Sequence, residues 1–190
     1  EHVDLGGGLG IPYRVDNEPP PLPDAYARIV HKHVARLGLK VMFEPGRMIA
    51  GNAGILVSQV IYVKEGEAKN FLIVDAAMND LIRPTLYEAF HDIRPVVQPP
   101  ADAPRMKVDV VGQVCETGDY LGLDRDLPVL KAGDLIAVGT AGAYGAVQAG
   151  TYNTRLLVPE VLVDGGRFAV VRPRGTYEEL IGLDRLPDWL

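Results

Sequence analysis

Two glycine-containing segments near the start of the chain could bind a ligand, and the first suits a phosphate. The first is Gly6-Gly7-Gly8-Leu9-Gly10, which follows a short apolar run. Glycines lack the Cβ atom that would keep backbone N–H groups away from a phosphate, although the spacing differs from the GxGxxG fingerprint of dinucleotide-binding proteins. The second is Glu44-Pro45-Gly46-Arg47, which offers a carboxylate, a glycine N–H and a guanidinium to one ligand. Each segment taken alone is also compatible with an ordinary turn.

A carboxylate-binding pair is predicted on a short helix in the middle of the chain. Arg83 and Tyr87 are four residues apart, so in a helix their guanidinium and phenol project from the same face. Together they could bind a carboxylate through charge-assisted hydrogen bonds. The alternative is an exposed arginine beside a packed tyrosine.

Two later segments combine a reactive side chain with glycine. One is Cys115-Glu116-Thr117-Gly118-Asp119, which follows a predicted strand. Its thiol could donate a proton and its carboxylate could bind an ammonium, but a single cysteine at a strand end can also be buried filler. The other is Ala141-Gly142-Ala143-Tyr144-Gly145-Ala146, whose small residues suit a close backbone approach beside one phenol. Here the alternative is a tyrosine that only packs.

The composition excludes several classes of partner. The 190 residues are 47% hydrophobic and 23% charged, as in globular proteins, and the net charge of −6 comes with no block of Lys or Arg. We therefore expect no nucleic-acid partner. No apolar run approaches the roughly 20 residues that a membrane span requires, and the N-terminal residues lack the features of a signal peptide. We expect a cytoplasmic protein without a membrane partner.

Neither the cysteine nor the histidines indicate a metal site. Cys115 is the one cysteine, which excludes an intramolecular disulfide and a multi-cysteine metal centre. We interpret four histidines as structural or solvated because they show neither metal-binding nor catalytic-triad spacing: His2, His31, His33 and His91. No metal is expected.

Residues 1–50 show the order strand, glycine turn, helix, strand, which is the pattern of a βαβ unit with parallel strands. Glu44 to Arg47 would then lie at the carboxyl end of a strand, where α/β barrels build their active sites. The predicted elements are a strand at His2–Leu5, a loop or polyproline segment at Asn17–Pro23, a helix from an Asp24 cap to Gly38, and a strand at Leu39–Phe43.

Residues 51–190 change to short strands rich in Val, Ile and Leu, which is typical of an all-β sandwich or barrel. One helix interrupts them, with Asn79 and Asp80 in its cap region, Pro84 in its first turn and a body at Leu86–His91. A second helix, at Thr176–Leu183, is expected to cover an open end. The predicted strands are Gly54–Val63, Asn70–Asp75, Lys107–Val114, Asp134–Thr140, Arg155–Val163 and Arg167–Arg172.

In this order, the motifs GGGLG, EPGR, IRPTLY, CETGD and GAY resemble the second half of the diaminopimelate decarboxylase family, of the alanine-racemase-like class of pyridoxal phosphate (PLP) enzymes. The resemblance implies an α/β plus all-β fold. Residues 1–50 would be the C-terminal portion of a (β/α)8, TIM-type, PLP-binding barrel, and residues 51–190 a C-terminal β-sandwich or β-barrel domain with an inserted helix. It also implies decarboxylation of meso-2,6-diaminopimelate to L-lysine and CO2, the last step of lysine biosynthesis.

The resemblance assigns the ligands of the cofactor, PLP. Gly8 and the segment Glu44, Pro45, Gly46 and Arg47 are expected to hold the phosphate, and Glu44 also to pair with the pyridine nitrogen. A protonated ring is the better sink for the electrons left by loss of CO2. Tyr144 is expected to lie over the edge of the cofactor and the substrate.

The same resemblance assigns the ligands of a small amino-acid substrate. Arg47, Arg83 and Tyr87 are expected to bind its distal carboxylate, and Glu116 its distal ammonium. Cys115 is the expected proton donor. With Glu116 it would reach the active site from the partner subunit of a homodimer, so that the site is shared between subunits.

Two family features are missing, namely the lysine that bonds to the cofactor and the histidine that stacks on it, both of which precede Glu1 in the family. We therefore expect the chain to be a fragment of a longer polypeptide and inactive alone. Ornithine-type relatives share GGG, EPGR and GAY, so the alternatives are a decarboxylase of another basic amino acid (ornithine or arginine type) and an inactive regulatory homologue. Ornithine has no distal carboxylate and would leave Arg83 unpaired. Thr117 stands where the family more usually has serine, a change that we expect to matter little.

Overall fold

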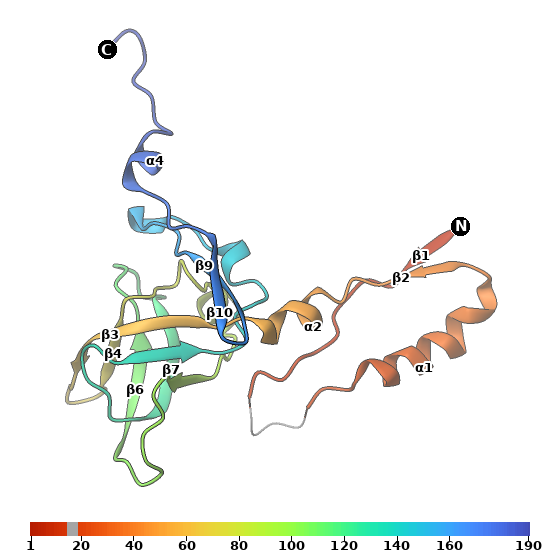
Figure 1. Cartoon of the computed structure of the whole chain (residues 1–190), viewed down its shortest axis with the longest axis horizontal. Helices are drawn as coiled ribbons and strands as arrows, with labels where there is room; N and C mark the ends of the chain where they lie inside the picture. The colour runs from red at the N-terminus through yellow and green to blue at the C-terminus, as the bar shows by residue number, and fades with distance from the viewer. Residues whose placement is uncertain (15–18) are drawn as a thin grey trace.

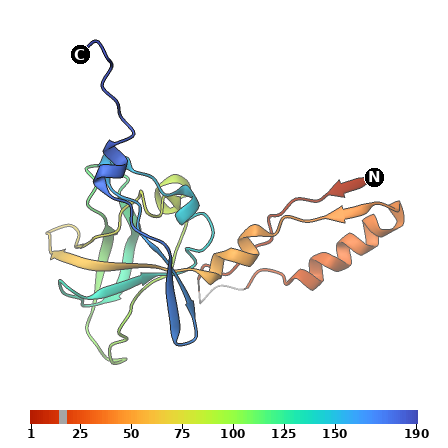
Figure 2. The same cartoon turned by 45° about the horizontal axis from the view of Figure 1, so that its top comes forward.

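The chain folds into an arm and a sheet domain, followed by a C-terminal hairpin and helix. The computed structural model describes residues 1–14 and 19–190. The arm, formed by residues 1–14 and 19–50, extends to one side of the sheet domain (Figure 1, Figure 2). Part of the loop predicted at Asn17–Pro23 lies outside the described residues.

The arm has the predicted order of strand, glycine turn, helix and strand. Strands β1 (His2–Asp4) and β2 (Lys40–Met42) pair in parallel. Between them lie helix α1 (Pro23–Val34) and the 3-10 turn η1 (Ala35–Leu37), which ends at Gly38 with a left-handed φ of 66°. Glycine adopts this conformation without steric cost, which is why it closes the helix.

The predicted cap of α1 is wrong. Leu22 occupies the N-cap position with extended backbone and no side-chain hydrogen bond, and Asp24 lies inside the first turn. Pro23 takes the first helical position, where its missing N–H has no helical partner to lose. The ring of Pro23 therefore fixes the start of the helix.

A short helix that the sequence did not indicate leads the arm into the sheet domain. Helix α2 (Gly46–Ala50) continues into the 3-10 turn η2 (Gly51–Ala53). Five residues are too few to produce a readable hydrophobic period. Gly51 is buried against Ile11, and a Cβ atom at this position would overlap the Ile11 Cδ1 atom. The close packing at this junction therefore requires glycine.

The sheet domain is one six-stranded mixed sheet that nearly closes on itself. Its strand order is β5-β8-β3-β4-β6-β7, and every neighbouring pair is antiparallel except β4 and β6. The edge strands β5 and β7 also contact each other. At this contact Gly122 of β7 lies so close to Ile93 of β5 that an added Cβ atom would be 3.0 Å from Ile93 Cδ1. The strands are β3 (Leu56–Lys64), β4 (Phe71–Val74), β5 (Ile93–Pro95), β6 (Arg105–Val111), β7 (Tyr120–Pro128) and β8 (Leu135–Val138).

The core lies inside this curved sheet. Every strand of the sheet contributes to it, and burial of these apolar side chains is the main favourable term for folding. The core residues are Val60, Leu72, Val74, Ala76, Leu81, Ile93, Val108, Val110, Leu121, Leu127, Ile136 and Val138. Helix α3 (Arg83–Tyr87) begins two residues after Leu81, so the core anchors its start.

Helix α3 is shorter than predicted. Pro84 lies in its first turn as expected, but the predicted cap region at Asn79 and Asp80 is wrong, because Ile82 occupies the N-cap position. The helix ends at Tyr87, because Glu88 adopts a left-handed φ of 52°. The predicted body at Leu86–His91 is therefore wrong. His91 instead lies in the connection to β5, fully buried.

A hairpin and a helix at the C-terminal end stand apart from the core. Strands β9 (Glu160–Asp164) and β10 (Arg167–Arg172) form a separate antiparallel pair, preceded by the 3-10 turns η3 (Ala146–Gln148) and η4 (Tyr152–Thr154). Helix α4 (Tyr177–Ile181) begins with a Thr176–Glu179 capping box, but none of its residues is buried. The expectation that this helix covers an open end is therefore wrong. The exposed apolar side chains of the hairpin are Val161, Leu162, Val163, Phe168, Val170 and Val171.

None of the described helices has both the length and the apolar character that a bilayer crossing demands.

Strand β7 allows a direct test of this fold. Leu121 is fully buried whereas Leu123, two residues later, is exposed, so we expect Leu121→Ala to lower the free energy of unfolding by about 2–5 kcal/mol. Leu123→Ala, the matched control, should change it by less than about 1 kcal/mol. Urea unfolding of the full-length protein, followed by circular dichroism, measures both. Equal losses in the two variants would contradict the assigned burial of Leu121.

Candidate functional site

The glycine loop after β1 lies against the segment after β2. The Glu44 N–H donates a hydrogen bond to the Gly6 carbonyl oxygen at 2.8 Å. A Cβ on Gly7 would overlap the Glu44 carbonyl oxygen, so this contact requires glycine. The two segments predicted to bind one anion are therefore neighbours.

These segments leave open space beside exposed backbone. Gly8 has a left-handed φ of 83°, and a Cβ built on Gly8 or on Gly46 would meet no atom within 4 Å. Arg47 follows in the first turn of α2. Open backbone beside a guanidinium suits a phosphate group, so the residues present fit the phosphate of PLP.

The end of α2 is joined to the segment that carries Tyr144. The Gly142 N–H donates to the Gly51 carbonyl oxygen at 3.0 Å, and the Ala141 N–H donates to Gly54 at 2.8 Å. A Cβ on Gly142 would overlap the Ala50 carbonyl oxygen. The predicted close backbone approach of this segment is thus confirmed, with the end of α2 and the following turn as its partner.

Tyr144 occupies a backbone conformation that tyrosine rarely adopts. Its φ is 61°, and a bulky residue in this region is a true outlier that points to a functional constraint. The half-exposed ring lies 5.9 Å from the Arg83 guanidinium carbon. The structure therefore brings these two candidate residues together.

Arg83 is buried, with 8% of its surface exposed. Its guanidinium donates to the Nε2 atom of His91 at 3.1 Å and lies 5.0 Å from the ring of Tyr13. Tyr87, four residues later, is exposed. The alternative of an exposed arginine beside a packed tyrosine is therefore wrong, because the arginine is buried and the tyrosine is exposed.

Helix α3 packs against the loop that carries Cys115 and Glu116. The Thr85 hydroxyl donates to the Gly118 carbonyl oxygen, and the Tyr120 hydroxyl donates to the Pro84 carbonyl oxygen at 3.2 Å. Cys115 is exposed and lies in this loop, because β6 ends at Val111 and not at the predicted Val114. Buried filler is therefore excluded as the role of this thiol within the chain.

Glu116 has a partner that sequence reasoning missed. The Tyr152 hydroxyl donates to the Glu116 carboxylate at 3.3 Å, and the Gly118 N–H donates to its other oxygen at 3.4 Å. Tyr152 is 36 residues away along the chain. No spacing rule connects such a pair, so no sequence signal could have found it.

Asp119 holds the Cys115 loop through hydrogen bonds, and sequence reasoning also missed this residue. Its carboxylate accepts the Val114 N–H at 2.6 Å and the Met78 N–H at 2.7 Å. The side chain is buried, and burial raises the pKa of this carboxyl above its ordinary value, although the two N–H groups oppose that rise. A Cβ on Gly112 would crowd both carboxylate oxygens, so this glycine makes room for the clamp.

A second, partly buried network ties the segment after Tyr144 to the sheet. Arg155 donates to the Asn79 side chain at 3.1 Å and to the Asp75 carbonyl oxygen at 2.7 Å, and it pairs with Asp80 at 3.4 Å. The Asn79 amide in turn donates to the Gly150 carbonyl oxygen at 3.0 Å. Residues 141–155 are therefore held at both ends.

The candidate residues form three groups. Gly8 and Glu44 to Arg47 lie in the arm. Arg83, at the start of α3, is close to Tyr144 from the loop after β8, and Cys115 and Glu116 lie in the loop beside α3. Within the part of the chain that the structure describes, no cluster of three or more potential metal ligands occurs.

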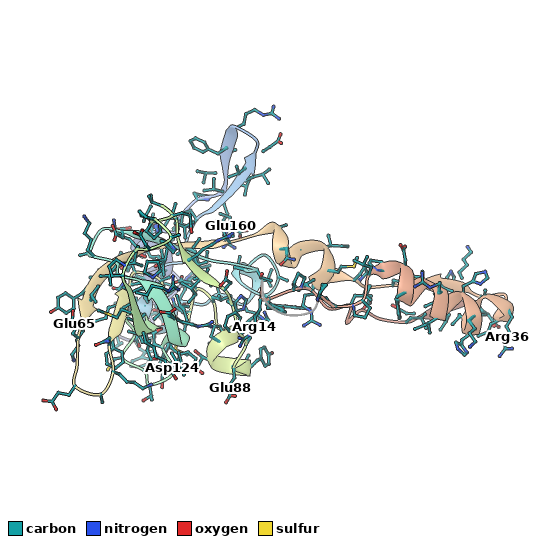
Figure 3. The ribbon with its side chains drawn as sticks, turned by 90° about the horizontal axis from the view of Figure 1, so that it is seen from below. Arg14, Arg36, Glu65, Glu88, Asp124 and Glu160 are labelled. Atoms are coloured by element: carbon teal, nitrogen blue, oxygen red, sulfur yellow. The ribbon has the colours of Figure 1, made fainter. Side chains whose placement is uncertain are left out.

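A groove of about 400 Å³ lies beside β7, away from these groups. In it the Phe90 ring contacts two guanidinium groups. The guanidinium carbons of Arg14 and Arg125 lie 3.7 Å and 3.8 Å from the centre of the ring. Figure 3 shows Arg14 and Asp124 on this side of the sheet domain. Three carboxylates line the groove together with these two guanidinium groups, so charges of both signs are mixed and no single ligand class is favoured.

Comparison with known proteins matches residues 13–142 to the model of the pyridoxal-dependent decarboxylase, C-terminal sheet domain, family. A diaminopimelate decarboxylase of Pseudomonas aeruginosa is 52% identical over 94% of the chain and 42% of its own length. One of Zymomonas mobilis is 45% identical over 100% of the chain and 44% of its own length. The crystal structure of diaminopimelate decarboxylase from M. jannaschii in co-complex with L-lysine is 36% identical, with a TM-score of 0.90 over 100% of this chain and 44% of that one. The chain thus spans less than half the length of these relatives.

The Asp119 clamp generates a prediction about the Cys115 loop. Asp119→Asn replaces one acceptor oxygen by a donor, so either Val114 or Met78 loses its partner at a cost of about 1–3 kcal/mol. We expect faster amide hydrogen exchange over residues 112–118 and a lower melting temperature.

Asp102→Asn is the matched control, because Asp102 is exposed. Unchanged exchange of the loop in Asp119→Asn would show that the clamp does not hold it.

Proposed function

Because this chain belongs to the pyridoxal-dependent decarboxylase family, as its C-terminal sheet domain, we propose that it is the C-terminal part of a diaminopimelate decarboxylase. The complete polypeptide would be a carboxy-lyase that converts meso-2,6-diaminopimelate to L-lysine and CO2 with PLP as cofactor. The high identity to relatives of that name supports this proposal. The observation in the structure that carries it is the environment of Arg83.

Arg83 is a buried cation without an acidic partner among the described residues. Its neighbours are the neutral His91 ring nitrogen and the faces of Tyr13 and Tyr144. A guanidinium cannot lose its proton in a protein, and a buried charge without a counter-ion is costly. An incoming carboxylate relieves that cost, and diaminopimelate retains a distal carboxylate that Arg83, with Tyr87 and Arg47, would bind.

The glycine loop and the Glu44 segment would hold the cofactor. Gly8, Pro45, Gly46 and Arg47 surround open backbone suited to the phosphate, and Glu44 would pair with the pyridine nitrogen. When bound, PLP supplies the delocalised ring that accepts the electron pair left by departing CO2. Tyr144 would cover the edge of this site and limit the access of water.

Cys115 would deliver the proton that replaces the lost carboxylate. Its thiol is exposed on a loop that Asp119 and Thr85 hold in place. Glu116, oriented by Tyr152, would bind the distal ammonium of the substrate. An exposed but fixed loop is suited to entering the active site of a partner subunit, so we infer a homodimer with a shared site.

Residues 1–50 would complete a (β/α)8 barrel together with chain that precedes them in the longer polypeptide, and residues 51–190 would form the C-terminal domain. The arm supports this assignment, because α1 contributes no buried residue and its region leaves apolar side chains exposed. They are Ile29, Leu37, Met42 and Phe43. We further propose a cytoplasmic location and neither nucleic acid nor membrane as partner.

Decarboxylases of ornithine or arginine are the second candidate. Those substrates carry a single carboxylate, which the reaction removes, so nothing remains to pair with Arg83. A buried guanidinium without a counter-ion disfavours such substrates.

The test is an assay of the full-length protein with PLP. We expect release of CO2 and L-lysine from meso-diaminopimelate, and kcat/KM values at least about a hundredfold lower for L-ornithine and L-arginine. Arg83→Met should raise KM for diaminopimelate about tenfold to a hundredfold, since a hydrogen-bonded charge is lost. Equal or better turnover of ornithine would overturn the assigned substrate.

The shared site is tested by mixing two inactive variants. Cys115→Ala removes the proton donor, and Gly8→Trp blocks the cofactor site of the same chain. If each site takes Cys115 from the partner, equal mixtures regain about a quarter of wild-type activity, because half of the dimers then contain one intact site. Absence of recovery after subunit exchange, verified by mass spectrometry of mixed dimers, would exclude sharing.

A further inference from the structure

We propose that His91 is a positioning residue that keeps Arg83 available for the substrate carboxylate by giving its guanidinium a neutral hydrogen-bond acceptor. This inference rests on the proposed function, since it concerns the same carboxylate site. It assigns a role in substrate selection to a histidine that has no spacing typical of catalysis.

His91 is held rigidly from two sides. The ring is fully buried, its Nδ1 atom lies 2.9 Å from the Gly139 carbonyl oxygen, and its Nε2 atom lies 3.1 Å from the Arg83 guanidinium. The backbone is fixed as well, because the Gly139 N–H donates to the Asp92 carbonyl oxygen at 2.8 Å. The Tyr13 ring packs edge-on at 5.5 Å.

The partners of the two ring nitrogens determine the tautomer. A guanidinium has donors only, so Nε2 must accept from Arg83, and a carbonyl oxygen accepts only, so the proton must lie on Nδ1. His91 is therefore neutral, and both of its nitrogens are satisfied. It orients Arg83 without cancelling the charge of the guanidinium.

The other neighbours of His91 favour the same neutral form. The charged and titratable groups that face it are Arg83 from α3, Arg125 from β7 and Tyr13 from the arm. Burial, followed by the charges of the two arginines, lowers the pKa of His91 below its ordinary value, despite the opposing hydrogen bond to Gly139. A carboxylate at this position would instead form an internal ion pair with Arg83 and compete with the substrate.

Two substitutions of equal size separate these roles. His91→Gln offers Arg83 a neutral acceptor, whereas His91→Glu offers a charged one. Each is made in the full-length protein with PLP, and two ligands are titrated by calorimetry. L-Lysine retains the distal carboxylate of the substrate, and 1,5-diaminopentane lacks it.

We expect His91→Glu to weaken L-lysine binding about tenfold to a hundredfold, because its carboxylate occupies Arg83. Binding of 1,5-diaminopentane should change by less than about threefold, and His91→Gln should weaken L-lysine binding much less than His91→Glu does. KM for diaminopimelate should rise more in His91→Glu than in His91→Gln, and kcat should change less than KM in both variants. His33→Glu, which makes the same change at an exposed helix position, is the control.

Equal L-lysine affinities of His91→Gln and His91→Glu would overturn the inference. If His91→Glu does not fold, His91→Asn takes its place. The shorter asparagine side chain keeps the donor for the Gly139 carbonyl oxygen but does not reach Arg83. An L-lysine affinity of His91→Asn equal to that of His91→Gln would again overturn the inference. A wild-type protein that does not decarboxylate diaminopimelate would instead refute the proposed function, so the two failures are distinguishable.

The pH dependence gives a second readout. Because the pKa of folded His91 is lowered, the ring stays neutral below the ordinary histidine value near 6.5 and takes up a proton only as the pH falls further. The protonated ring no longer accepts a hydrogen bond from Arg83. L-Lysine affinity should therefore fall as the pH drops through the lowered pKa of His91. His91→Gln should remove this decline relative to wild type. A decline that persists unchanged in the variant would contradict the role of His91.

Discussion

A single desolvated guanidinium governs the arrangement of the candidate site. Arg83 cannot escape the cost of burial by losing its proton, so its surroundings must compensate for lost water without neutralising it. They do so with a neutral ring nitrogen from His91 and with the aromatic faces of Tyr13 and Tyr144. These side chains come from the arm, from the connection before β5 and from the loop after β8. Three segments that are distant in sequence thus meet around one cation.

Two backbone-level devices make that arrangement rigid. Glycines at the junctions let main chains approach more closely than any side chain would allow, as between Gly142 and Ala50 and between Gly7 and Glu44. Buried polar side chains then tie loops to the sheet, with Asp119 below the Cys115 loop. The candidate residues lie on loops and short helices, and these segments are held against the nearly closed sheet. Such bracing is what a preorganised site requires.

The sequence predicted those features that depend on neighbouring residues, and it missed those that depend on distant ones. Gly38 and Pro84 act on the backbone within a turn, so the parallel pair in the arm and the place of Pro84 in the first turn of α3 were foreseen. Strand β7 was not, because Gly, Asp and Pro disfavour strands and a bulge at Asp124, with φ of 54°, interrupts its pairing. The contact of Asp119 with Met78 spans 41 residues. No local signal encodes it.

Tyr144 has a consequence for the evolution of the domain. Its left-handed backbone costs about 1–2 kcal/mol relative to glycine, and its neighbours Gly142 and Gly145 are glycines already. Any screen for thermal resistance alone would therefore reward Gly at position 144 and discard the ring. A tyrosine in so unfavourable a conformation points to a use of the ring itself. Under the proposed function, stability and activity are thus opposed at this one position, and a library designed to stabilise the protein should leave it untouched.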